Sequence, residues 1–191
     1  MRTIKMRLDH IAYRVSDREK TAKFFKEAFG YIEVNRFPII FDNGSTSQCI
    51  ALEPPEKVSD EMDWECCHNQ YTITGVLDIT GYFHLAPEIF VSDGTPDSIV
   101  GKWVAARDGI GGVHHLAYQV DSPRKMAQEW LDSEWGEFSG DVLTCPEDDL
   151  EQVFSKPHPL TGVIYEFIKR GKNGFCEANV QRLMESTKDN R

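Results

Sequence analysis

An internal repeat is the feature of this sequence that most constrains its fold. The segment DHIAYRV at 9–15 matches HHLAYQV at 114–120, with His, Ala, Tyr and Val in register at an offset of 105 residues. The match extends beyond these segments, since Ala22 meets Ala127 at the same offset. Self-similarity at a fixed offset is the signature of a duplicated supersecondary unit. The sequence therefore predicts two copies of one module.

Both copies begin as a half-buried strand. Ile11, Tyr13 and Val15 point to one face when side chains alternate with a period of two. We expect these large residues, and their counterparts in the second copy, to pack under a helix. The opposite face carries His10 and His115, each followed two residues later by a small alanine. That face is expected to line a cavity.

A helix follows each of these strands. The segment SDRE at 16–19 matches a capping box and predicts a helix with Ser16 as its N-cap. In the second copy, Ser122 is the expected N-cap and Pro123 the first helical residue. Further strand candidates complete each copy as a βαβββ unit; they cover 31–37, 45–53, 82–91, 140–144, 150–155 and 163–169.

These elements predict an α+β fold in which two βαβββ modules form a paired, cupped mixed β-sheet with flanking helices. The C-terminal appendage is expected to lie over the mouth of the cavity. The predicted boundaries are 5–93 for the first module, 57–81 for an insertion within it, 94–110 for a linking helix, 111–171 for the second module and 172–191 for a C-terminal helical appendage.

Composition limits the partners. With 21 basic and 31 acidic residues, the formal net charge of −10 repels nucleic acid and anionic membrane surfaces. No stretch is long and apolar enough to be a membrane span. The five cysteines form an odd, irregularly spaced set, which indicates reduced thiols in a cytoplasmic protein. We expect a cytoplasmic protein whose partner is a small-molecule substrate, with neither nucleic acid nor membrane bound.

A carboxylate in a buried strand points to a metal. Glu166 interrupts the apolar run VIYEFI at 163–168, and an inward glutamate needs a partner. The first module ends in a comparable strand, where Glu88 is the expected symmetry mate of Glu166. Together with His10 and His115, these carboxylates give nitrogen and oxygen ligands suited to one divalent ion, which could be Zn, Ni, Co, Mn or Fe.

Other candidates carry weaker signals. His114 alternates away from its neighbour and is expected to face the helix side. His84 shares a face with Glu88 and is expected to be a cavity-lining or surface residue. The CCH segment at 66–68 lacks the spacer found in zinc motifs, so it is not expected to chelate.

Three motifs resemble the vicinal-oxygen-chelate superfamily. They are DHIA at 9–12, GVHHLA at 112–117 and PHPLTGVIYEF at 157–167, and the likeness covers roughly 5–54 and 82–170. They resemble methylmalonyl-CoA epimerases, and are also similar to glyoxalase I and the catalytic half of 4-hydroxyphenylpyruvate dioxygenases.

The resemblance implies a ligand set. It places His10, His115 and Glu166 on the shared metal ligands, and Glu88 near the fourth ligand only after a one-residue gap. It also implies a homodimer.

Three functions are consistent with this resemblance. The leading one is epimerase, isomerase or lyase chemistry through a metal-stabilised enolate, with Glu88 or Glu166 moving the proton. The third strand of the first module departs from the epimerase pattern, because SQCIAL at 47–52 has no carboxylate before Glu53. The second is an Fe(II)-dependent dioxygenase, because two histidines and one carboxylate form a facial triad. The third is a metal-free binding protein of the bleomycin-resistance type.

Overall fold

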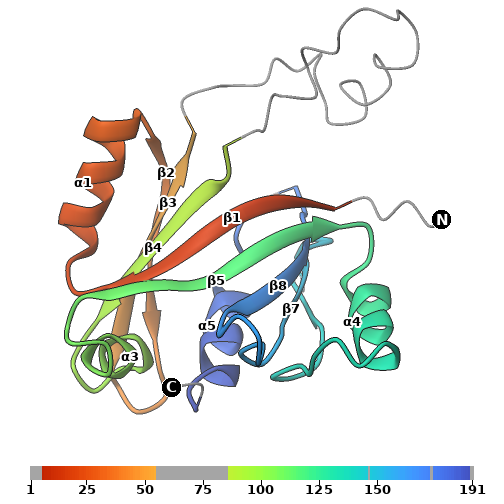
Figure 1. Ribbon diagram of the computed structural model, residues 1–191. Helices are drawn as coiled ribbons and strands as arrows, with labels where there is room; N and C mark the ends of the chain where they lie inside the picture. Colours follow the sequence, from red (N-terminus) through yellow and green to blue (C-terminus); the bar gives the residue numbers. More distant parts are fainter. Residues whose placement is uncertain (1–5, 55–85, 146, 173, 190–191) are drawn as a thin grey trace, which may run out of the picture.

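The computed structural model describes residues 6–54, 86–145, 147–172 and 174–189. Its centre is one eight-stranded mixed sheet with the strand order β2-β3-β4-β1-β5-β8-β7-β6 (Figure 1). The strands are β1 (Met6–Val15), β2 (Ile32–Ile40), β3 (Thr46–Glu53), β4 (Glu88–Gly94), β5 (Gly111–Val120), β6 (Leu143–Thr144), β7 (Glu151–Phe154) and β8 (Ile164–Lys169).

The two halves of this sheet are related by an approximate twofold symmetry. The repeated strands β1 and β5 lie antiparallel at the centre. On the outer side of each lies a parallel strand, which is β4 beside β1 and β8 beside β5. The predicted α+β class and cupped mixed sheet are therefore confirmed. The predicted insertion at 57–81 lies outside the described residues.

Two helices cover the outer faces of the sheet. Helix α1 (Arg18–Phe29) contacts β3 and β4, and α4 (Pro123–Asp132) contacts β7 and β8 (Figure 1). Under α1 lie Ile11, Tyr13 and Val15, in a cluster that also contains Ala22. The predicted packing of the first repeat strand under its helix is therefore confirmed.

The start of α1 corrects the predicted capping box. Its N-cap is Asp17, not Ser16, because Asp17 has extended backbone angles and its carboxylate accepts a hydrogen bond from the Lys20 amide at 3.0 Å. An aspartate one residue further on fills the same role, so the helix begins one residue later. Ser122 caps α4 as expected, by accepting from the Lys125 amide.

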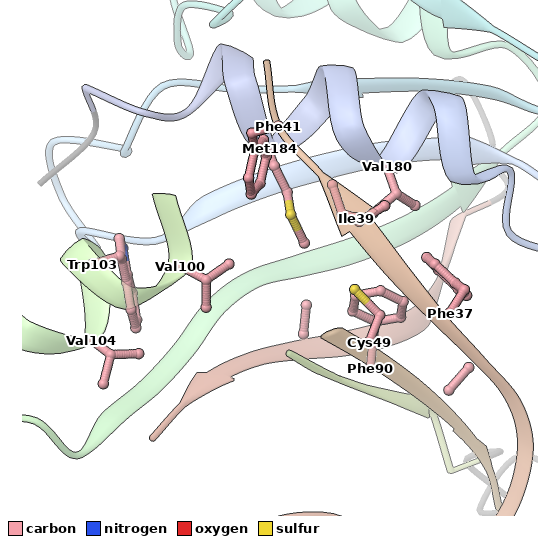
Figure 2. Packing of buried hydrophobic residues seen from close by; sticks show 12 residues of the cluster. Phe37, Ile39, Phe41, Cys49, Phe90, Val100, Trp103, Val104, Val180 and Met184 are labelled. Atoms are coloured by element: carbon pink, nitrogen blue, oxygen red, sulfur yellow. The ribbon is translucent and has the colours of Figure 1, made fainter. Parts of the chain in front are cut away.

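Two further helices lie on the concave side. Helix α3 (Ile99–Ala105) precedes β5, and α5 (Glu177–Ser186) contacts both β2 and β7, so it spans the cup between the two halves. Figure 2 shows Val180 and Met184 of α5 packed with Ile39 of β2 and with Phe41, which follows β2, in the largest apolar cluster. Burial of this apolar face holds α5 in place, since apolar burial is the main stabilising term in folding.

Candidate metal centre

Three predicted ligands meet inside the cup. His10 of β1, His115 of β5 and Glu166 of β8 are all buried, and each offers one ligand atom to a common point. The Glu166 Oε2 atom lies 3.2 Å from His10 Nε2 and 3.0 Å from His115 Nε2. The two Nε2 atoms are 3.2 Å apart. No other group of this kind is found among the described residues.

This geometry fits a divalent ion. Ligands at about 2.1 Å from an ion, at right angles to each other, lie about 3.0 Å apart. The three observed separations are close to that value, so the atoms match one triangular face of an octahedron. Two imidazoles and one carboxylate on such a face are the donor set of non-haem Fe(II) sites. His10, His115 and Glu166 would hold the ion.

Bulges in the two central strands orient the histidines. The β1–β5 pairing has register shifts that leave Asp9 of β1 and His114 of β5 as extra residues. A bulge adds one residue and redirects the local side chains. The prediction that His114 faces the helices was wrong, because the bulge turns this buried side chain into the same cavity as His115.

The two extra residues contact equivalent atoms. Asp9 Oδ1 accepts a hydrogen bond from His10 Nδ1 at 2.8 Å, and His114 Nδ1 lies 2.8 Å from His115 Nδ1. Because a carboxylate only accepts, His10 carries a hydrogen on Nδ1, and Nε2 is the ring nitrogen that faces the cluster. A carboxylate that fixes the tautomer of a histidine in this way is typical of metal sites.

Glu166 is oriented by a residue that sequence reasoning missed. Gln152 of β7 is buried and donates from Nε2 to Glu166 Oε1 at 2.8 Å. Its own amide oxygen accepts from Asn179 Nδ2 of α5 at 3.3 Å. The glutamine thus occupies one oxygen of Glu166 and leaves Oε2 facing the histidines. A polar residue directly before the apolar pair Val153 and Phe154 in the segment EQVF is the signal that could have identified it.

Glu88 is not brought into the cluster. The register pairs Glu166 with Ala117 and pairs Phe90 with Ala12, the repeat mate of Ala117. The position related to Glu166 by the repeat is therefore Phe90, and the predicted symmetry of Glu88 with Glu166 was wrong. The prediction matched Glu88 to Glu166 because both lie in the last strand of a module. The residue equivalent to Glu166 is instead the one that pairs with the equivalent residue of the central strand.

The Glu88 carboxylate has a different partner. Its Oε2 accepts from Arg170 Nη2 at 2.7 Å, and the same nitrogen donates to Asp9 Oδ1 at 2.6 Å. Arg170 also stacks on the ring of Phe175. Glu88 and Asp9 are thus both held by one guanidinium at the edge of the site.

The electrostatics keep Glu166 ionised without a metal. Burial raises the pKa of a carboxyl group, but His10 and His115 outweigh it and lower the pKa of Glu166 to about 2. Burial likewise lowers the pKa of His10, yet the carboxylates of Glu166 and Asp9 raise it to about 9. His115 has its pKa lowered by burial, with only partial compensation from Glu166. The two histidine ligands are therefore electrostatically unequal.

The cluster opens onto an apolar cavity. Phe90, Phe154 and Phe175 line it together with Leu183 and Met184 of α5. The His115 ring lies 4.6 Å from that of Phe154, and the His10 ring lies 5.2 Å from that of Phe175. The predicted position of the C-terminal helix over the cavity is thus confirmed. The candidates His84 and 66–68 lie outside the described residues.

Comparisons with known proteins agree with this geometry. Residues 7–134 match the model of the Glyoxalase/Bleomycin resistance protein/Dioxygenase superfamily. The fold and the buried His, His and Glu cluster define a protein of the glyoxalase and dioxygenase class. The chain belongs to this superfamily. No curated protein matches the chain.

Solved structures share the fold. A triple mutant of 4-hydroxymandelate synthase from Streptomyces coelicolor has a TM-score of 0.70 at 20% identity over 97% of this chain. The chain spans 54% of that synthase, about half its length. Methylmalonyl-CoA epimerase from Mycobacterium tuberculosis has a TM-score of 0.59 at 18% identity, covering 90% of this chain and 93% of the epimerase. At these identities the likeness concerns the fold. No helix in the described part of the chain has the length and apolarity needed to cross a membrane.

Proposed function

We propose that this protein is an Fe(II)-dependent oxygenase that acts on a small, largely apolar organic substrate. His10, His115 and Glu166 hold the ion. The observation that carries the proposal is that Phe90 occupies the position related to Glu166 by the repeat. Because a phenyl ring has no atom that can coordinate the ion, the described residues supply three ligands. When bound, the iron supplies activation of dioxygen at the coordination positions that the protein leaves open.

The enolate alternative needs a residue that carries a proton, and the described carboxylates beside the site are all engaged. Asp9 accepts from His10 and Arg170, Glu88 accepts from Arg170, and Glu166 belongs to the cluster. A general base must reach the substrate proton, and neither Asp9 nor Glu88 lines the cavity. Proton transfer is therefore the second candidate, even though the sequence motifs favour epimerases.

The chain's own residues orient the ligands and exclude water. Asp9 and Gln152 fix His10 and Glu166. The rings of Phe90, Phe154 and Phe175 give the substrate a dry apolar wall. Such a wall favours a substrate with an aromatic or aliphatic body.

The first test is metal content and oxygen uptake. We expect the freshly purified chain, loaded anaerobically with Fe(II), to bind one ion and to consume oxygen with members of a panel of aromatic 2-oxo acids and hydroxylated aromatic acids. His115→Ala should lose both properties. His158→Ala is the matched control, because this histidine lies outside the cluster and contacts the Trp135 carbonyl; it should keep both.

Two results would contradict the proposal. Exchange of a substrate C–H for solvent deuterium without oxygen uptake would assign the site to an isomerase or lyase. Binding of an organic ligand by a chain that retains no metal would instead favour the binding-protein class.

A further inference from the structure

Arg14 is a buried cation at the wall of the metal cavity. It lies on β1 four residues after His10 and is only 3% exposed. Arg14 lines the same cavity as His10, His115 and Glu166. Four residues of extended strand span about 13 Å, so Arg14 and His10 lie well apart along one wall.

The guanidinium is incompletely satisfied. Nη2 donates to Thr187 Oγ1 at 3.2 Å, and Nη1 is buried without a hydrogen-bond partner. Within the described ranges, no carboxylate forms an ion pair with Arg14. Trp103 offers only a distant ring face, 5.8 Å from Cζ to the ring centroid.

No described carboxylate compensates Arg14 by direct pairing. Burial lowers its pKa to about 9, and the nearby cation of Arg107 acts in the same direction. Four carboxylates border a separate outer hollow that Arg14 also touches, namely Asp42, Asp97, Glu185 and Asp189, but none of them is an ion-pair partner of Arg14. A buried charge without a counterion is strongly unfavourable, so a bound anion would offset a real cost.

We propose that Arg14 binds the carboxylate of a substrate whose apolar body lies against the cavity's aromatic rings and whose other end reaches His10, His115 and Glu166. This inference rests on the proposed function for the location of the reacting end. The anion site itself rests on Arg14. A planar guanidinium matches the two oxygens of a carboxylate, and such a pair is strong in a desolvated site.

A carboxylate suits this site better than a phosphate. One guanidinium with a free Nη1 can balance a single negative charge. A phosphate monoester carries nearly two charges at neutral pH and more acceptor oxygens than Arg14 and its neighbours can satisfy. The cavity walls are otherwise mainly apolar, with aromatic and aliphatic side chains. The predicted ligand is thus a monoanionic acid with an apolar body.

The test compares an acid with its neutral amide. Binding of phenylacetate, phenylacetamide and inorganic phosphate to the full chain as purified is measured by titration calorimetry at one fixed metal content. We expect the native chain to bind phenylacetate at least about tenfold tighter than phenylacetamide, since a charged hydrogen-bonded pair is lost in the amide. Arg14→Met should abolish this preference, and Arg14→Lys should keep part of it.

Arg107→Met is the matched control. Arg107 stacks on Trp103, the ring that also lies near Arg14, with Cζ 3.6 Å from the ring centroid. Arg107 does not line the metal cavity. This variant should keep the native preference. Arg14→Met should melt at the same temperature as the native chain or higher, because it removes an uncompensated buried charge.

Several outcomes would overturn the inference. Persistence of the acid preference in Arg14→Met would place the carboxylate elsewhere, for example at the metal. Equal binding of acid and amide by the native chain would show that no anion site exists. Phosphate binding as tight as phenylacetate binding, and dependent on Arg14, would make this a phosphate site. A much lower melting temperature of Arg14→Met would show that the cation is already compensated. This test measures ligand binding, whereas the test of the proposed function measures oxygen uptake. A failure of one can therefore be told apart from a failure of the other.

Discussion

Asp9 and His114 are repeat mates that do different chemistry at the same place. Each is the extra residue of a bulge and contacts Nδ1 of the histidine that follows it. The carboxylate of Asp9 makes His10 a strong donor, whereas the neutral ring of His114 gives His115 no such support. A duplicated backbone has therefore kept its geometry while its side chains give the two ligands unequal basicity.

The hydrogen bond from Gln152 should matter for metal affinity. We expect Gln152→Leu to weaken metal binding about 10- to 100-fold, because Glu166 Oε1 loses its donor and the carboxylate loses its orientation. Competition with a chromophoric chelator measures the affinity. Glu88→Gln is the control and should leave affinity close to native, since Glu88 contacts Arg170 rather than the cluster. A larger loss in Glu88→Gln than in Gln152→Leu would show that Glu88 coordinates the ion after all.

At the scale of elements, helix α3 supports the wall that carries Arg14. It contacts β1, β4 and β5, and it also touches α5. Its N-cap is Ser98, which is fully buried, accepts from the Gly101 amide at 3.0 Å and donates to the Thr95 carbonyl at 2.7 Å. This hydroxyl therefore both donates and accepts a hydrogen bond, so one side chain fixes the start of the helix.

Removal of this cap should destabilise the fold. Ser98→Ala is expected to lower the free energy of unfolding by about 1 to 2 kcal/mol, because the first turn of α3 loses its side-chain acceptor in a buried site. Ser16→Ala is the matched control, since Ser16 is exposed and does not cap α1; its effect should stay within about 0.5 kcal/mol. Denaturant unfolding measures both. Equal effects would contradict the assigned caps.

On the scale of the whole molecule, the candidate metal joins the two halves of the sheet. His10 comes from the first repeat, whereas His115 and Glu166 come from the second. Helix α5 also bridges both halves, through β2 and β7. A bound ion and the helix would therefore act on the same junction. Assembly into a homodimer, which the sequence resemblance implies, stays a prediction.

Metal removal should lower thermal stability. An ion present at about 100 times its dissociation constant stabilises the folded state by about 2.7 kcal/mol, because the unfolded chain lacks the site. For a chain of this size, we expect a chelator to lower the melting temperature by roughly 5 to 10 °C. Thermal unfolding with and without chelator measures the shift. His115→Ala should melt at the same temperature in both conditions; a shift of the native size in this variant would place the stabilising ion elsewhere.

The sequence by itself determined the α+β class, the two central strands and three ligands of the candidate site. The repeat fixed the partners His10 and His115, and a carboxylate in an apolar strand identified Glu166. These are local signals. The period of two assigns each side chain to one face of its strand, and a buried charge requires a partner.

Only the tertiary structure decided which residues complete the site. The strand register put Phe90, not Glu88, opposite Glu166, and the bulges turned His114 inward. Gln152 and Arg14 became neighbours of the site through long-range pairing and packing. Register and bulges depend on how distant strands align, and a shift of one residue reverses which face a side chain occupies. No local pattern in the sequence contains that information.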